Sequence, residues 1–239
     1  MCFHNSMSKK AQQLAARYGR NINLSAVEIA EQILEENYHI TGFFHPEQLI
    51  VTSEKELQEI RWGLIPFWAK DKKTADKISK GTVNARAETI FEKPSYRNPI
   101  MHHRCLIPST GYYEWHENKD GTKVPYYIYL KDQEIFSFAG IYSSWLNPDT
   151  GKEEMTFSMI TTDANELTKK IHNSGKNPFR MPVIISMKDE EKWLDPKLTR
   201  EQIDALLKPY PADEMDAYEV NKEVFESYNP KDEAVMGKE

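Results

Sequence analysis

Cys2 is the residue with the most distinctive potential chemistry, because it directly follows the initiator Met1. Removal of Met1 would leave an N-terminal amine beside a thiol. At pH 7 roughly a sixth of an α-amine of pKa about 7.7 is neutral, against about 0.04% of a lysine amine. A neutral amine attacks an aldehyde to form an imine, and the adjacent thiol can close onto the imine carbon to give a thiazolidine ring. The alternative is an incidental cysteine at a frayed terminus.

Three other polar residues are candidates for a site, and each has a structural alternative. Glu114 lies in the apolar run GYYEW, where desolvation by its aromatic neighbours would favour a protonated, proton-donating carboxyl group. It would otherwise be the water-facing residue of an alternating strand. His172 ends the helix-like run TTDANELTKKIH, where a histidine often only complements the helix dipole. Asn84, in TVNARAET, could equally be a turn or cap residue.

Positive charge is concentrated in residues 61–104, which carry ten Lys and Arg against four acidic residues, although the whole chain has a formal charge of −6. Cations interleaved with aromatic rings suit single-stranded nucleic acid, because phosphates contact the cations and unstacked bases contact the rings. The alternative is a solvated lysine-rich loop beside core aromatics. The rings of this window belong to Trp62, Phe67, Trp68, Phe91 and Tyr96.

The composition excludes several classes of protein. The chain of 239 residues has no apolar run long enough for a membrane span and no signal-like apolar stretch near Met1, so we expect a cytoplasmic protein. Cys2 and Cys105 are its two cysteines and cannot supply a disulfide framework. His102 and His103 adjoin Arg104 and Cys105, but adjacent histidines on a strand point to opposite faces. We therefore expect no metal and no cofactor, with Cys105 in the core.

Helical patterns flank a β-rich middle. Ser8–Tyr18 is predicted to be a helix with Ser8 as N-cap and Gly19 as its stop, and a second helix is predicted from Ser25 to Glu36. Between residues 49 and 160 the pattern changes to short strand-like runs, with hairpin signals at NKDGT, KDQ and NPDTG. Helical spacing returns at residues 165–171.

After residue 171 the pattern predicts a strand at MPVIIS, two helices and one last strand-like run, YEVNKEVF. The second of these helices begins at Thr199 with Gln202 three residues later, which is a capping box. Since no linker-like composition separates these parts, we predict a single α+β domain with a largely antiparallel β core. We place this domain at residues 1–230 and a polar tail at residues 231–239.

Several motifs, taken together and in order, resemble one family, the SOS-response-associated peptidase (SRAP) proteins that crosslink to abasic sites in single-stranded DNA. The resemblance implies an SRAP fold with a barrel-like core and covers over nine-tenths of the chain. The pairing of NARAET with CLIP-x-x-G-[FY]-Y-E-W is its most specific part. The matching segments are Cys2, WGLIPFW at 62–68, NARAET at 84–89, RCLIPSTGYYEW at 104–115, TTDAN at 161–165, IH at 171–172 and RMPVII at 180–185.

The resemblance implies a role for each candidate catalytic residue. Cys2, freed by autocatalytic removal of Met1, would condense with the ring-opened abasic deoxyribose and end as a thiazolidine. Asn84 would position the α-amine and the sugar, and Glu114 would act as general acid and base in ring opening, imine formation and Met1 removal. His172 would orient the sugar hydroxyl and shuttle a proton. The implied activity is of the lyase and peptidase type, in the SOS response to DNA damage.

The DNA contacts implied are less specific. Arg86 and Arg180 would bind the flanking phosphates, for which arginine forks are suited, and Arg97 and Arg104 belong to the same basic window. Trp68 either lines the DNA groove or packs in the core, whereas Trp62 is expected to pack. The expected partner is single-stranded DNA containing abasic sites, bound by a monomer.

One departure from the family pattern affects the DNA contacts. The family usually opens Met-Cys-Gly-Arg, whereas this chain has Phe3 and His4 after Cys2. Phe3 puts a bulky ring beside the nucleophile, and His4 replaces the missing arginine only in part because it is mostly neutral near pH 7. This departure keeps open the alternative of a non-enzymatic single-strand binder. A second alternative, which the family name suggests, is a thiol peptidase that acts on external peptides with Cys2 as nucleophile and His172 as base.

Overall fold

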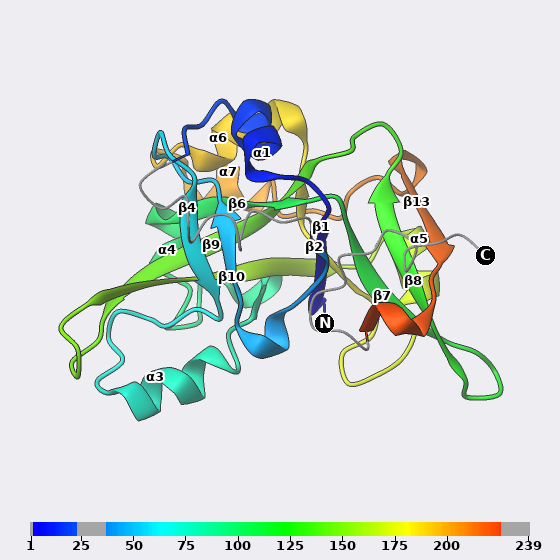
Figure 1. Ribbon diagram of the computed structural model, residues 1–239, viewed down its shortest axis with the longest axis horizontal. Helices are drawn as coiled ribbons and strands as arrows, with labels where there is room; N and C mark the ends of the chain where they lie inside the picture. Colours follow the sequence, from blue (N-terminus) through cyan, green and yellow to red (C-terminus); the bar gives the residue numbers. More distant parts are fainter. Residues whose placement is uncertain (1, 23–36, 226–239) are drawn as a thin grey trace.

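Short apolar runs broken by turn residues form two β-sheets in the computed structural model, which describes residues 2–22 and 37–225 (Figure 1). Among these residues, one sheet has five strands, in the spatial order β13-β8-β7-β1-β2. All of its neighbouring strands run antiparallel. Its strands are β1 (His4–Met7), β2 (Asn37–Thr41), β7 (Gly111–Glu117), β8 (Lys123–Leu130) and β13 (Met215–Glu219).

The second sheet has eight strands among the described residues, five of them in the order β12-β9-β10-β4-β3. β11 and β5 also pair with β10, and β6 pairs with β9. Its strands are β3 (Glu47–Ile50), β4 (Gln58–Trp62), β5 (Asn84–Arg86), β6 (Arg104–Ser109), β9 (Phe136–Leu146), β10 (Glu153–Asp163), β11 (Arg180–Pro182) and β12 (Ile184–Ile185).

β10 organises the second sheet, and its pairing departs from the all-antiparallel pattern. β4 runs parallel to β10 opposite Thr156 and Phe157, and β5 continues parallel to it opposite Met159–Thr161. A helical excursion, α3 (Lys72–Ser79), separates β4 from β5 in the chain. The β core is thus largely antiparallel, as predicted. The expected barrel is not closed, although one bridge joins Val51 to Leu106 on β6.

The helices of the described residues are short, with at most eight residues each. Figure 1 shows α1, α6 and α7 together on one side and α3 on the other. Across residues 2–22 and 37–225, no helix is long and apolar enough to cross a membrane. The other helices are α1 (Ala11–Tyr18), α4 (Pro99–His102), α5 (Glu166–Ile171), α6 (Glu190–Leu194) and α7 (Arg200–Asp204), with 3₁₀ turns η2 (Gly42–Phe44), η3 (Ala87–Thr89), η4 (Met187–Asp189), η5 (Ala212–Glu214) and η6 (Lys222–Phe225).

The predicted helix ends are partly confirmed. Gly19 ends α1 in the left-handed conformation, with φ of 58°. The predicted N-cap Ser8 is wrong, because its hydroxyl pairs with Thr110 Oγ1 at 3.3 Å and the helix begins at Ala11. The capping box at Thr199 is confirmed. The predicted helix over 25–36 and the domain boundary at 230 lie outside the described residues.

Two of the three hairpin signals are confirmed. NKDGT connects the antiparallel pair β7 and β8, and NPDTG connects β9 and β10. KDQ is not a hairpin, because the chain leaves the first sheet after β8 and enters the second at β9. The prediction of a strand at YEVNKEVF is wrong for most of that run, because β13 ends at Glu219, the second residue of the run, and η6 follows at Lys222–Phe225.

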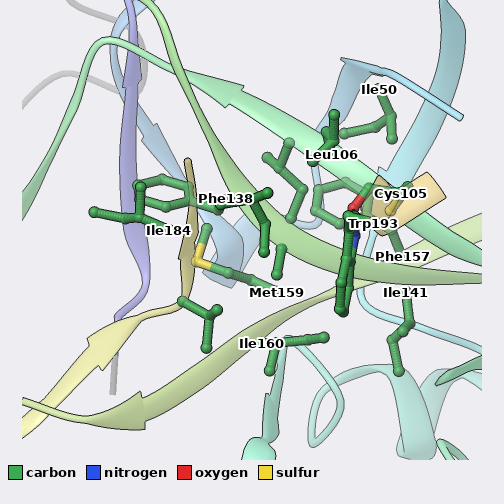
Figure 2. Packing of buried hydrophobic residues seen from close by; sticks show 14 of the residues in the cluster. Ile50, Cys105, Leu106, Phe138, Ile141, Phe157, Met159, Ile160, Ile184 and Trp193 are labelled. Carbon is green, nitrogen blue, oxygen red and sulfur yellow. The ribbon is translucent and has the colours of Figure 1, made fainter. Parts of the chain in front are cut away.

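The core lies on and around the second sheet, and Figure 2 shows its packing. Cys105 is fully buried, as predicted, and its carbonyl oxygen accepts a hydrogen bond from Trp193 Nε1 at 2.8 Å. Trp62 is also fully buried, as predicted, and its indole donates to the Val83 carbonyl at 2.8 Å. The second sheet, which carries Asn84 on β5 and Arg180 on β11, therefore rests on a dense apolar core.

Candidate active site

Two strands of the first sheet bring Cys2 beside Glu114. β1 pairs with β7 through Asn5↔Tyr112 and Ser6↔Gly111. Because this pairing is antiparallel, the residues before Asn5 approach those after Tyr112. Cys2 is 1% exposed, and burial together with the negative charge of the Glu114 carboxylate raises the pKa of its thiol well above the ordinary value. The thiol is therefore neutral at physiological pH.

Asn84 holds the main chain of Cys2. Its Nδ2 donates to the Cys2 carbonyl oxygen at 2.9 Å. That oxygen can only accept, so the contact fixes the orientation of the amide and leaves Oδ1 as its other polar atom. Oδ1 is buried and, within the described part of the chain, accepts no hydrogen bond. The amide thus offers a free acceptor beside Cys2.

Glu114 and His172 form a buried pair. Glu114 Oε2 lies 3.6 Å from His172 Nε2, with the side chains 5% and 7% exposed. The opposite ring nitrogen, Nδ1, lies 2.9 Å from the Arg180 carbonyl oxygen and is assigned as its donor. With the Nδ1 proton assigned in this way, Nε2 is the ring nitrogen that faces the Glu114 carboxyl group. Glu114 Oε1 is buried and accepts no hydrogen bond from the described residues.

The Arg180 main chain connects the two halves of the site. Its carbonyl oxygen accepts from His172 Nδ1 and lies 3.9 Å from the Cys2 Sγ. β10 sets this position, because it pairs with Asn84 at Met159 and with Arg180 at Asp163. His172 follows α5, which Thr168 anchors to the Tyr112 hydroxyl at 2.9 Å. The four predicted catalytic residues therefore come together from four separate parts of the chain.

A cleft of about 520 Å³ opens onto this group of residues. Glu114 and His172 line it, so the buried pair is reached from this cleft. Loop residues Ser174, Gly175, Lys176 and Asn177 also line it, together with Phe3, His4, Phe43, Trp115 and Lys123. The mixture of apolar rings, amides and cations suits a ligand that has both a ring and a charged group.

Three of the predicted DNA contacts lie on the surface. Arg86 and Arg97 are exposed, and Arg86 also contacts the cleft residue Asn177 through its guanidinium. Trp68 is 42% exposed beside Phe67, which is 66% exposed. These positions leave Arg86, Arg97 and Trp68 accessible to a strand, and their contact with DNA stays a prediction.

Arg180 was expected to bind a phosphate, and its side chain is instead buried in a network of carboxylates that the sequence did not indicate. The guanidinium pairs with Glu88 at 2.6 Å and with Asp163 at 2.8 Å, and it donates to the Thr161 carbonyl. Glu88 belongs to the motif NARAET and Asp163 to the motif TTDAN. An acidic residue inside each of these motifs was the sequence signal that could have indicated a buried partner for Arg180. A phosphate contact by Arg180 would have to compete with these carboxylates.

The expected DNA contact of Arg104 is wrong. Arg104 is 4% exposed, and its guanidinium donates to four main-chain carbonyls. These belong to Ile100, Met101, Trp193 and Asp195. Because the carbonyls of a helix end and of a neighbouring helix need donors, Arg104 satisfies them and holds α4 and α6 against β6.

His4 does not replace the missing arginine as a cation. Burial and the neighbouring His39 lower the pKa of His4 to about 3. Its Nδ1 lies 2.8 Å from His39 Nε2, and its ring contacts Phe225 edge-on at 5.0 Å. His4 is therefore neutral in the folded protein and offers no positive charge to a phosphate.

The described residues also contain no group of three or more His, Cys, Asp or Glu side chains that could hold a metal ion.

A buried cysteine next to the chain terminus, a buried carboxyl and imidazole pair beside it and the strands that bring them together are the features expected of an SRAP-type protein. The family profile described as SOS response associated peptidase (SRAP) matches residues 1–227. The chain belongs to this family.

Relatives and solved structures agree with this assignment. The abasic site processing protein YoqW of Bacillus subtilis is 42% identical over 212 residues, which cover 86% of this chain and 90% of that protein. The abasic site processing protein HMCES of Gallus gallus is 34% identical over 171 residues, which cover 63% of this chain and 48% of that protein. A crystal structure of a protein from Bacteroides thetaiotaomicron is similar with a TM-score of 0.94 and 50% identity over the whole of both chains.

Proposed function

We propose that this protein processes abasic sites in single-stranded DNA by forming a covalent thiazolidine between Cys2 and the ring-opened abasic deoxyribose. The observation that carries the proposal is the convergence of Asn84, Glu114 and His172 on Cys2 beside an open cleft. Relatives named abasic site processing proteins support it. Removal of Met1 is the required first step, because it frees the α-amine.

Two buried acceptors support a reacting amine at this place. Oδ1 of Asn84 and Oε1 of Glu114 both accept no hydrogen bond from the described residues. A buried acceptor without a donor costs about 1–3 kcal/mol. The α-amine of a processed chain and the hydroxyls of an opened sugar are donors that fit such positions. The site is therefore suited to an N-terminal amine with a sugar beside it.

The chemistry balances without an oxidant or a metal ion. The α-amine nitrogen attacks the aldehyde carbon, and one of its protons passes to the aldehyde oxygen. The resulting hydroxyl leaves as water with a proton from Glu114, and the nitrogen returns its second proton to the Glu114 carboxylate. This gives an imine and restores Glu114. The Cys2 sulfur then bonds to the imine carbon while the thiol proton passes to the nitrogen, by way of the Glu114 and His172 pair. The product is a thiazolidine, and one water is released.

Glu114 has a second use in the removal of Met1. Hydrolysis of the bond between Met1 and Cys2 consumes one water and releases methionine. A carboxylate beside the Cys2 main chain can take the proton of the attacking water and return it to the leaving amine. This single cut would be the peptidase activity that the family name describes.

The raised pKa of the Cys2 thiol argues against a thiol peptidase acting on external peptides. Such enzymes need a thiolate, which a neighbouring cation and a histidine stabilise by lowering the thiol pKa. In this chain burial and Glu114 act in the opposite direction. A neutral thiol that reacts second, after the amine has formed an imine, needs no such stabilisation.

The test uses intact protein and an abasic oligonucleotide. We expect the purified chain to have the mass of the protein without Met1, and its incubation with a single strand containing one abasic site to give a product that survives denaturation. Cys2→Ala should give none, and Glu114→Gln should retain Met1 or form the product at least tenfold more slowly. A processed wild-type chain that gives no product would refute the proposal.

A further inference from the structure

A stacked pair of aromatic rings lines the cleft beside the nucleophile. The ring centroids of Phe3 and Phe43 lie 4.5 Å apart with an interplanar angle of 26°, and both residues line the cleft. The His4 ring meets Phe43 edge-on at 5.9 Å. Phe43 nevertheless remains 59% exposed. A large apolar ring that stays open at the mouth of a cleft is available to a ligand.

The backbone holds Phe43 firmly in this position. β1 pairs with β2 through His4↔Thr41, and Gly42 N donates to the Phe3 carbonyl at 2.8 Å. A Cβ at Gly42 would lie 2.5 Å from Val83 Cγ1 and 3.2 Å from the Trp62 ring, so only glycine fits against this part of the core. The turn that carries Phe43 is therefore tied both to the N-terminal strand and to the core.

We propose that the exposed face of Phe43, backed by Phe3, is the stacking platform for an unpaired base next to the abasic nucleotide. This inference rests on the proposed function. The same cleft contains Glu114 and His172, where the abasic sugar would react, and Lys176, a cation suited to a phosphate. A neighbouring nucleotide would thus find a ring surface and a cation within reach of the reacting sugar.

The chemistry of His4 explains why stacking matters in this chain. Since His4 is neutral, the N-terminal strand gives no ionic contact to a phosphate. Stacking of a base on an aromatic ring contributes affinity without charge and tolerates every base, because each base has a π-face. Phe3 and Phe43 would supply by stacking what an arginine at position 4 would supply by charge.

The test uses processed full-length protein and a single-stranded oligonucleotide with a tetrahydrofuran abasic analogue, which has no aldehyde and binds without reacting. 2-Aminopurine is placed on the 5′ side of the analogue in one oligonucleotide and on the 3′ side in another. We expect binding to quench 2-aminopurine on one side, because the base stacks on Phe43. Phe43→Ala should remove the quenching and weaken binding about 5- to 150-fold, with an unchanged dependence on salt.

Three matched variants make the result specific. Phe43→Tyr keeps an aromatic face and should keep the quenching, whereas Phe43→Leu keeps an apolar side chain without that face and should lose it. Phe44→Ala is the positional control, since Phe44 is the next residue and is 64% exposed. It should bind and quench as wild type does. The Tyr and Leu pair also separates loss of stacking from loss of folding.

The proposal that Phe43 stacks on a base would be overturned if Phe43→Ala quenched 2-aminopurine as wild type does at both positions of the probe. It would also be overturned if Phe43→Ala bound the oligonucleotide with unchanged affinity. Equal effects of Phe44→Ala and Phe43→Ala would overturn it as well. The proposed function fails by a different result, which is the absence of a Cys2 crosslink to a true abasic site in wild type. A crosslinking protein whose binding ignores Phe43 would therefore refute this inference alone.

Discussion

At the scale of the residue, burial sets the protonation of the groups around Cys2. Burial raises the pKa of the Cys2 thiol and lowers that of His4, because each loses water around its charged form. Both groups are thus neutral in the folded protein. In the proposed reaction the amine of Cys2 consequently acts first and its neutral sulfur second.

The raised thiol pKa predicts slow alkylation of Cys2. In the native protein at pH 7.5, we expect iodoacetamide to modify Cys2 at least tenfold more slowly than in the urea-unfolded chain, with a rate that still rises with pH above 8.5. Peptide mapping by mass spectrometry separates Cys2 from Cys105. Fast native alkylation that reaches a plateau near pH 7 would mean that the thiol pKa is lowered, contrary to this structure.

The low pKa of His4 predicts a loss of stability in acid. The folded pKa is about 3, below the ordinary 6.5, so only the unfolded chain gains a proton as pH falls below 6.5. The cost between pH 8 and pH 5 is about 2 kcal/mol of the free energy of unfolding. Urea titrations of His4→Gln should lack this part of the pH dependence, whereas the exposed-site control His102→Gln should retain it. Parallel pH profiles for wild type and His4→Gln would contradict the assignment.

At the scale of the element, close packing of strands positions the site. β7 carries Glu114 and begins at Gly111, where a Cβ would lie 2.2 Å from the Tyr127 ring of β8. That ring is itself held by a hydrogen bond from its hydroxyl to the Thr110 carbonyl at 2.7 Å. β1, which follows Cys2 in the chain, pairs with β7 at Gly111. This pairing therefore depends on a residue without a side chain at position 111.

Gly111→Ala tests this dependence. The added methyl group must displace a buried ring, so we expect a loss of about 1–3 kcal/mol in the free energy of unfolding and slower crosslinking. Gly81→Ala is the control, because its Cβ would meet only the Ile78 carbonyl oxygen at an ordinary 3.5 Å. Equal stability of both variants and wild type, measured by urea denaturation, would show that β7 adjusts without cost.

At the scale of the whole molecule, the basic window divides into two structural classes. Arg104 is a buried cross-link among main-chain carbonyls, whereas Arg97 is exposed. Arg180, which lies outside this window, is also buried, and its guanidinium pairs with the carboxylates of Glu88 and Asp163. The positive charge of the window therefore overstates the charge that a DNA strand can reach.

Arg104 and Arg97 should separate stability from DNA affinity. Arg104→Met leaves several buried carbonyls without a donor, so we expect a loss of about 3 kcal/mol or more in the free energy of unfolding. Arg97→Met should leave stability within about 0.5 kcal/mol and reduce the slope of log affinity against log salt by about 0.7 for single-stranded DNA. Urea denaturation and fluorescence anisotropy measure the two quantities. Both roles would be contradicted if Arg97→Met lost stability and Arg104→Met changed only the salt dependence of DNA binding.

The sequence alone determined the local features, because their causes lie within a few residues. Gly19 ends α1 and Thr199 begins α7 through caps that each need only a neighbouring turn. The motifs around Cys2, Asn84, Glu114 and His172 also indicated the family, since side-chain type and order are properties of the chain itself. The single α+β domain followed from the alternation of these patterns.

Only the tertiary structure decided which polar groups are buried and which partners they have. Arg97 and Arg104 belong to the same window in sequence, yet one faces solvent and the other faces carbonyls from α4 and α6. His4 is neutral because it is buried and packed against His39, which lies on a different strand. Desolvation and pairing depend on residues far apart in the chain, so local sequence could not fix them. The same long-range pairing of β1, β7 and β10 brings four distant residues together, two of which, Glu114 and His172, line the cleft.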